Sequence, residues 1–155
     1  MLLLAVTGLG QGLLAAHRLH KRADVLGRLA RLMDYWADRI RATAAPLSDL
    51  ASEAASVAEF CALPLWHGAP YTRVSLCEAV QTAAILNHED KRLLVEWLDG
   101  WGGGDLDGEV ERCRRYAAQF RDRFETAVTE ARRRGRSYIT LGLCAGGMLA
   151  LLLGG

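Results

Sequence analysis

Charged residues are missing from both ends of this chain. All Lys, Arg, Asp and Glu residues lie between Arg18 and Arg136, and the stretches 1–16 and 139–155 contain none. The average of 24% charged residues over 155 residues therefore describes no actual part of the chain. Two uncharged apolar ends around a charged middle argue against an ordinary soluble globule. The middle is long enough for one small domain only, which argues against a large multidomain enzyme.

The chain also has little net charge and few cysteines. It has 19 Lys and Arg against 18 Asp and Glu, a net charge of +1, which argues against a nucleic-acid-binding protein with a basic surface. None of the four cysteines forms a CxxC pair. Because a structural zinc site needs closely spaced Cys or His ligands, we interpret these cysteines as buried free thiols in a reducing cytoplasm.

Residues 1–17 and 138–155 are each predicted to form a transmembrane helix. A spanning helix needs about 20 apolar residues and at least about 17, so both segments are near the lower limit. A signal peptide has its positive charge before the apolar core. Here Arg18, Lys21 and Arg22 follow the core. We therefore favour an uncleaved anchor at the N-terminus, with a signal peptide and a buried helix as the alternatives.

Basic residues flank the charged middle on both sides and predict its orientation. Cations beside membrane segments stay in the cytoplasm. Residues 18–137 should therefore form a cytoplasmic domain, with both chain ends reaching across the membrane. The residues that set this topology are Arg18, Lys21, Arg22, Arg132, Arg133, Arg134 and Arg136.

Each predicted membrane segment has a pair of glycines four positions apart. These are Gly8 and Gly12 in the first segment, and Gly142 and Gly146 in the second. Glycines at this spacing let helix backbones approach closely in lipid. They are candidate helix-packing residues, although glycine is common in membrane helices in general.

Apolar residues in the middle recur at the spacing of amphipathic helices. One helix is predicted over 24–42, where apolar residues repeat every three or four positions, and it can continue directly from the first membrane segment. Further helices are expected over 47–62, from a capping box at Ser75–Glu78, after the cap Asn87, and from Leu106 onwards. The predicted fold is all-α, a helical bundle flanked by N- and C-terminal transmembrane helices.

Helix breakers divide these elements. Two prolines and Gly68 predict a loop over 63–73, and a run of glycines predicts a sharp break over 99–105. Gly135 is the only break expected between Leu106 and the apolar C-terminus.

No group of residues in the sequence indicates catalysis. The run 102–104 is rich in glycine but lacks the GK[ST] ending of a phosphate-binding loop. Asp105, Asp107 and Glu109 lack the later Glu ligand of a calcium loop. His17 and His20 have no carboxylate or Cys close by in sequence, so we interpret them as membrane-interface residues. We predict no enzymatic activity, no cofactor and no metal.

The order and spacing of these features resemble the stage III sporulation protein AB family. The run 137–146 (SYITLGLCAG) is similar to the family's aromatic residue, Leu-Gly pair and glycine-containing membrane helix. Trp101-Gly102, Asp105 and Glu109 stand where the family tends to have Leu-Gly, Asp and Gln. Pro46-Leu47 after an amphipathic helix is a weaker match. The resemblance covers almost the full length of the chain.

The resemblance implies a role in endospore formation. It places the chain in the mother-cell membrane around the forespore, in a channel-like assembly that links the two cells. It also implies a cytoplasmic domain similar to that of the type II secretion F protein. The implied partners are the membrane, other stage III sporulation membrane proteins and an AA-type secretion-like ATPase. The expected function is a non-catalytic platform that couples this ATPase to the channel, with no nucleic acid and no small-molecule substrate.

Two alternatives stay open. One is a membrane-anchored helical regulator or adaptor unrelated to sporulation. The other is a membrane-anchored enzyme that uses the 63–73 loop or the glycine-rich turn, with His67, His88 and Asp105. For a platform, charged faces of the long helices are candidate partner contacts, although such faces are usually only solvated. These candidates are Arg28, Arg31, Arg112 and Arg115.

Overall fold

Residues 2–153 of the chain fold into five helices in this computed structural model. The structure describes the backbone of residues 2–153 and the side chains of residues 16–134 and 137. The helices are α1 (Leu2–Thr43), α2 (Leu47–Ser56), α3 (Arg73–Thr82), α4 (His88–Asp99) and α5 (Leu106–Leu153). Since every element over this backbone range is a helix, the all-α prediction is confirmed.

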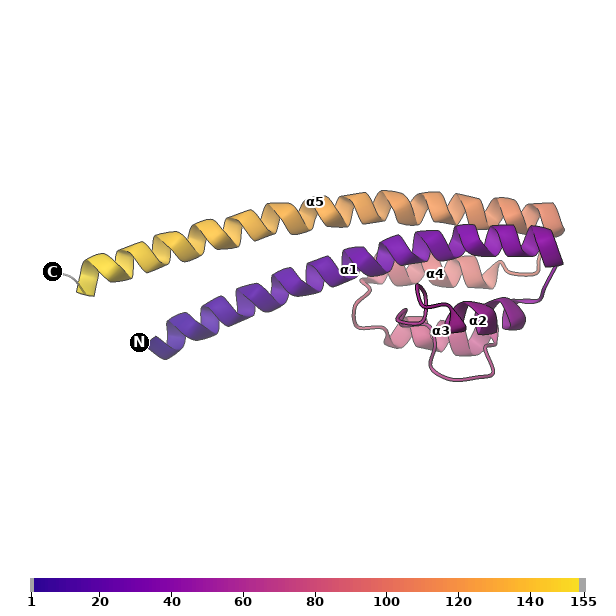
Figure 1. Cartoon of the computed structure of the whole chain (residues 1–155), viewed down its shortest axis with the longest axis horizontal. Helices are drawn as coiled ribbons and strands as arrows, with labels where there is room; N and C mark the ends of the chain where they lie inside the picture. The colour runs from indigo at the N-terminus through magenta and orange to yellow at the C-terminus, as the bar shows by residue number, and fades with distance from the viewer. Residues whose placement is uncertain (1, 154–155) are drawn as a thin grey trace.

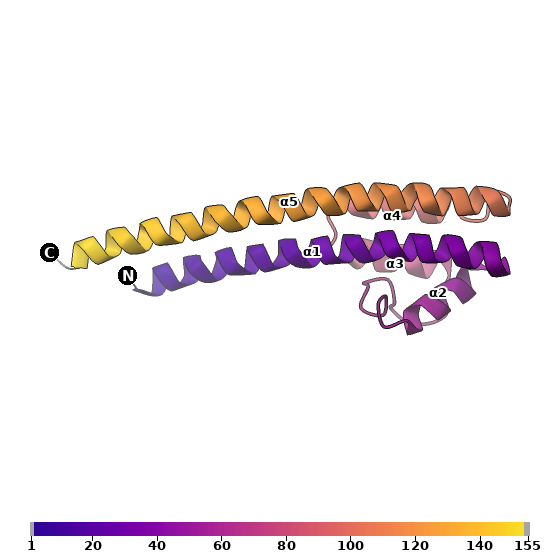
Figure 2. The same ribbon diagram turned by 45° about the horizontal axis from the view of Figure 1, so that its top comes forward.

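Helices α1 and α5 form a long antiparallel hairpin (Figure 1). The two chain termini lie at one end of the hairpin, which we call the terminal end. Helices α2, α3 and α4 pack along the other half, toward what we call the distal end, and the view in Figure 2 agrees. Helix α1 runs without interruption into the predicted 24–42 helix, as expected. The break predicted at Gly135 is wrong, because α5 continues through it. A single glycine inside a helix lowers its stability by only about 1 kcal/mol relative to alanine, so the helical turns on either side can keep the helix continuous.

The two predicted transmembrane segments are not tested by the described side chains. No helix within the described residues is long and apolar enough to cross a membrane. Apart from Ala16 and His17, the segments 1–17 and 138–155 lie outside the residues whose side chains are described. The same is true of the candidate packing glycines Gly8, Gly12, Gly142 and Gly146, and of Arg136.

Tryptophans from α1 and α4 form the centre of the core. Trp36 stacks on Trp97 with ring centroids 5.0 Å apart. The Trp101 ring packs edge-on against both, with its centroid 6.3 Å from that of Trp36 and 5.2 Å from that of Trp97. The Trp36 indole N–H also donates to the backbone oxygen of Leu50, at 3.1 Å, and so ties α2 to the same cluster. The predicted apolar face of the 24–42 helix is thus the face that α1 buries.

Apolar residues of α1 and α5, many of them small, form a buried seam between the two helices. The α5 side of this seam consists of the buried residues Val110, Cys113, Ala117, Phe120, Ala127 and Ala131. Gly27 of α1 lies against the Phe124 ring, and a Cβ at position 27 would stand 3.2 Å from Cδ2 of that ring. The apolar face of α5 therefore packs against α1 within the domain.

Two boundaries of the predicted helices are wrong. Helix α2 ends at Ser56 rather than at residue 62, because Phe60 and Leu63 are drawn into the core by successive turns. In these turns the Phe60 N–H donates to the Val57 oxygen and the Leu63 N–H to the Phe60 oxygen, both at 2.9 Å. Burial of apolar side chains here outweighs the helical pattern, and the loop covers 57–72 rather than 63–73.

The cap of α3 also lies three residues earlier than predicted. Thr72, not Ser75, is the N-cap, and its hydroxyl accepts the Ser75 N–H at 3.2 Å. The Ser75 hydroxyl in turn accepts the Thr72 N–H at 2.9 Å. A hydroxyl thus fills the place of the usual Glu in a capping box. The predicted cap of α4 is confirmed, since Asn87 accepts the Asp90 N–H at 2.8 Å.

Candidate functional site

The residues of the enzyme alternative are not brought together. His88 begins α4, whereas Asp105 follows its C-terminal end, about 18 Å away for a helix of this length. His67 lies exposed in the 57–72 loop. Within the described residues, no group of three His, Cys, Asp or Glu side chains could hold a metal ion. The polar feature that does gather side chains from several helices is an ion network toward the terminal end.

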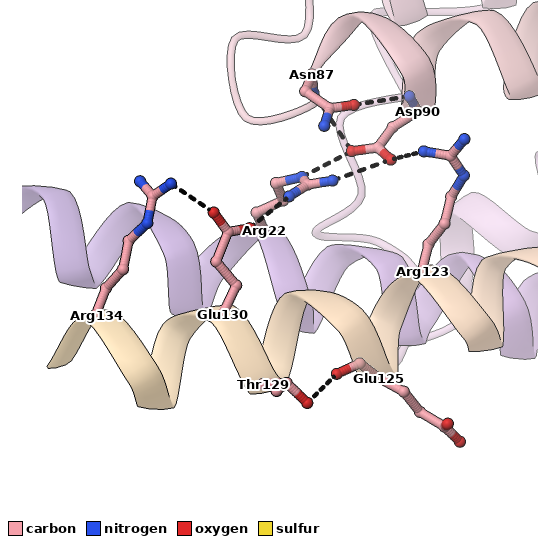
Figure 3. A network of polar contacts seen from close by, with 8 residues as sticks. All are labelled: Arg22, Asn87, Asp90, Arg123, Glu125, Thr129, Glu130 and Arg134. Atoms are coloured by element: carbon pink, nitrogen blue, oxygen red, sulfur yellow. Dashed lines mark hydrogen bonds and ion pairs between the residues drawn. The ribbon is translucent and has the colours of Figure 1, made fainter. Parts of the chain in front are cut away.

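Asp90 is at the centre of this network, and its side chain is fully buried (Figure 3). Arg22 of α1 donates to both of its oxygens, from Nε at 2.8 Å and from Nη2 at 3.2 Å. Arg123 of α5 donates to Oδ1 from Nη1 at 3.0 Å. We call Arg22, Asp90 and Arg123 the three-helix clamp, because each residue comes from a different helix. Charge-assisted bonds to two guanidinium groups compensate the cost of burying this carboxylate.

Two further carboxylates, one on α5 and one on α4, extend the clamp. Glu130 lies 3.9 Å from Nη1 of Arg22 and 2.7 Å from Nη2 of Arg134. Glu89 lies 3.6 Å from Nη2 of Arg123. Two of the residues predicted to set the membrane topology, Arg22 and Arg134, are therefore engaged in ion pairs within the chain, Arg22 in the part-buried clamp and Arg134 at the surface of α5. The local sequence gives no sign of this role for Asp90, because its partners are 68 and 33 positions away.

The glycine-rich turn between α4 and α5 forms a second polar cluster. Gly102 adopts a positive φ of 77°, which favours glycine, and donates its N–H to Oε1 of Glu109 at 3.1 Å. Asp105 caps α5 by accepting the Gly108 N–H at 2.9 Å. Each of the three residues thus has its own role in the turn. Gly102 provides the positive φ, Asp105 caps α5, and the buried Glu109 accepts the hydrogen bond from the turn. A Gln amide oxygen at position 109 could accept the same bond.

Arg112 closes this turn from the side of α5. Its guanidinium lies over Gly100, where an added Cβ would stand only 1.5 Å from Nη1. Its Nε is 3.9 Å from Oε2 of Glu109, and neither of these two buried atoms has a hydrogen-bond partner among the described residues. A bridging water would satisfy both groups at this separation. The geometry gives the turn a structural role, which is to fix the direction of α5 relative to α4.

The same turn lies within the part of the chain that matches a known family. Residues 73–154 match the family described as stage III sporulation protein AB, which is more than half of the chain. The chain belongs to the stage III sporulation protein AB family. This membership gives it a role in sporulation and confirms the resemblance seen in the sequence. No curated protein and no solved structure matches the chain.

The stage III sporulation protein AB match divides the clamp. Asp90 and Arg123 lie inside the matched region with α3, α4, the glycine-rich turn and α5. Arg22 lies outside it with α1 and α2. The clamp therefore joins the matched part of the chain to the first long helix.

Three of the four arginines predicted as partner contacts bind within the domain. Arg28 donates to Asp24 and to the Glu59 backbone oxygen, both at 2.9 Å. Arg31 forms an ion pair with the Glu59 carboxylate. Arg112 is part-buried over the glycine-rich turn. Arg115 is exposed on α5 and keeps the surface position expected of a contact.

Proposed function

We propose that this chain is a non-catalytic membrane platform in the assembly that supports endospore formation. The family match carries this proposal, because it assigns the sporulation role. Residues 1–17 and 138–155 would anchor the platform in the mother-cell membrane around the forespore, with residues 18–137 in the cytoplasm. The cations beside these segments favour that orientation.

The shape of the described helices supports a platform. The part of α1 from residue 18 to its end at Thr43 is about 40 Å long at 1.5 Å per residue. The hairpin would therefore hold the distal end about that far from the membrane surface. The clamp and the tryptophan cluster fasten the short helices to the hairpin, so that it would move as one piece.

The distal end is the surface we propose for the AA-type secretion-like ATPase. The exposed large apolar side chains of the described residues are Val74 and Leu106, with 65% and 43% of their surface accessible. Both lie toward this end, since Arg73 reaches the backbone oxygen of Asp99 at 3.5 Å and Leu106 begins α5. Other stage III sporulation membrane proteins would contact the hairpin within the membrane.

Deletion of the gene tests this function. The deletion strain should arrest spore development after engulfment while vegetative growth stays intact. A deletion strain that sporulates normally would overturn the proposed role and favour a regulator or adaptor unrelated to sporulation.

Complementation tests the absence of catalysis. We expect a variant with His67→Ala, His88→Ala and Asp105→Asn to restore sporulation fully, because Asn caps a helix as well as Asp does. Failure of this variant at a normal protein level would favour the enzyme alternative.

A further inference from the structure

Charge at the terminal end of the α1–α5 hairpin is of one sign. No Asp or Glu precedes Asp24 in α1, and none follows Glu130 in α5. Beyond these positions the sequence has seven of the 19 cations and none of the 18 carboxylates. The net charge of +1 is therefore the sum of a basic terminal end and an acidic remainder of the chain.

The last carboxylates before this end are already engaged. Asp24 accepts a hydrogen bond from Arg28 at 2.9 Å, and Glu130 forms an ion pair with Arg134 at 2.7 Å. Arg22 is committed to the clamp, with only 17% of its side chain accessible. Among the described residues, the ion pairs include none from the exposed cations Arg18, Lys21, Arg132 and Arg133. We call these four residues the basic collar.

The basic collar belongs to both long helices at the same level of the hairpin. Ala23 and Ala131 are buried where α1 and α5 pack, with 5% and 2% of their surface accessible. Glu130 of α5 approaches Arg22 of α1 to 3.9 Å, within about one helical turn of the collar residues on each helix. His17 and His20 are also exposed at this level of α1. The collar is therefore one surface, shared by both helices.

We propose that the basic collar binds the headgroups of anionic phospholipids in preference to zwitterionic ones. This inference rests on the membrane placement in the proposed function. Guanidinium groups form paired hydrogen bonds with phosphate oxygens, and exposed cations beside a membrane segment are attracted to anionic lipid. The uncharged stretches that adjoin the collar, 1–16 and 139–155, would lie against the acyl chains of a lipid bound there.

Lipid retention by the full-length chain tests this inference. The protein is reconstituted into vesicles with equal amounts of phosphatidylglycerol and phosphatidylcholine, extracted in a mild neutral detergent, and its retained lipids are quantified by mass spectrometry. We expect several-fold enrichment of phosphatidylglycerol over the bulk ratio, and loss of the enrichment at high salt.

Two matched variants assign the enrichment to the collar. The variant Arg18→Gln, Lys21→Gln, Arg132→Gln, Arg133→Gln should retain the two lipids at the bulk ratio. The control Arg41→Gln, Arg73→Gln, Arg114→Gln, Arg115→Gln removes four exposed cations from the distal half and should keep the enrichment. Circular dichroism of both variants verifies that the helices are intact. Equal enrichment in the two variants would overturn the inference.

Two further outcomes separate the inference from the proposed function. A chain that stays with the vesicles in alkaline carbonate but shows no lipid preference refutes the collar's role and leaves the membrane anchor standing. A chain released by carbonate refutes both. Loss of the enrichment in millimolar inorganic phosphate at constant ionic strength would assign the collar to free phosphate and overturn the lipid assignment.

Discussion

Asp90 shows how one buried charge can join three helices. Its carboxylate receives hydrogen bonds from Arg22, Arg123 and the backbone N–H of Asn87. The residue type and its position as the third residue of a helix are visible in the sequence, and they predict a cap. The clamp is not visible there, because nothing local distinguishes Arg22 and Arg123 from the other arginines of their helices. Long-range charge pairing of this kind emerges only when the helices are placed side by side.

We expect Asp90→Ala to lower the free energy of unfolding by about 3–5 kcal/mol, because it leaves two part-buried guanidinium groups without their carboxylate. Urea unfolding of the full chain in neutral detergent measures the change. The control is Asp34→Ala, which removes an exposed ion pair between the same long helices, with 53% of Arg121 and 45% of Asp34 accessible. Its cost should stay below about 1 kcal/mol. Equal costs for the two variants would show that burial adds nothing to the clamp.

Cys113 gives the domain a sensitivity to alkaline pH. Burial raises the pKa of its thiol to about 12, with an opposing influence from the Trp97 indole N–H. In the unfolded chain the pKa of a Cys thiol is about 8.5. Between these values the unfolded state releases a proton that the native state keeps. The contribution of the buried Cys113 thiol to the free energy of unfolding is therefore fully present below the pKa of the thiol in the unfolded chain. This contribution is lost as the pH rises toward the pKa of the thiol in the folded chain.

We expect the free energy of unfolding to fall above pH 9 by up to about 1.4 kcal/mol per pH unit. Cys113→Ala should reduce this slope, whereas Cys61→Ala should not, because Cys61 is exposed. Burial also raises the pKa of Tyr35 and Tyr116, so part of the slope should remain in the Cys113 variant. Urea titrations at pH 7.5, 9 and 10 provide the comparison. Identical slopes for wild type and Cys113→Ala would contradict it.

At the scale of elements, the long helices were predictable and the connection after α2 was not. Periodicity over 24–42 and after Leu106 extends for several turns, so local pattern and burial agree. The stretch 57–63 is also helical in pattern, yet Phe60, Leu63 and Leu65 are buried through turns instead. In a short segment, a few apolar contacts outweigh the small gain from continuing a helix.

The residue that follows the C-terminal end of α1 has a strained backbone conformation, and a substitution should relieve this strain. Ala44 adopts a φ of 49°, in the left-handed region, while its N–H bonds to the Ile40 oxygen at 2.9 Å. Pro46 follows two residues later and prevents the helix from continuing. Glycine is the residue usually found at this position of a helix end.

Ala44→Gly should therefore raise the free energy of unfolding by about 0.5–1 kcal/mol, because glycine adopts this conformation without a Cβ clash. Ala42→Gly is the matched control, since residue 42 is exposed within the last turn of α1. It should lower the free energy by about as much. Thermal unfolding followed by circular dichroism measures both changes. A destabilising Ala44→Gly would show that the position is not strained.

At the scale of the whole molecule, the hairpin places both chain ends together (Figure 1). Antiparallel packing of α1 and α5 means that both ends leave the domain on one side, as two membrane helices entering from the same face require. The sequence indicated this arrangement through its charge-free ends, although it contained no signal for how the short helices pack along the distal half.

Cysteine labelling tests the proposed orientation of the chain, which rests on the cations beside the predicted membrane segments. We expect the exposed Cys61 to react with a membrane-impermeant maleimide only after protoplasts are permeabilised, because the 57–72 loop should be cytoplasmic. When the chain is expressed in vegetative cells, whose cytoplasmic membrane faces the medium, the variant with Cys61→Ser and Gly155→Cys should react in intact protoplasts, since its C-terminus should lie outside. Both chains also contain Cys77→Ser and Cys144→Ser, and they keep Cys113, which is buried. Labelling of both chains from the same side would refute the two-helix topology.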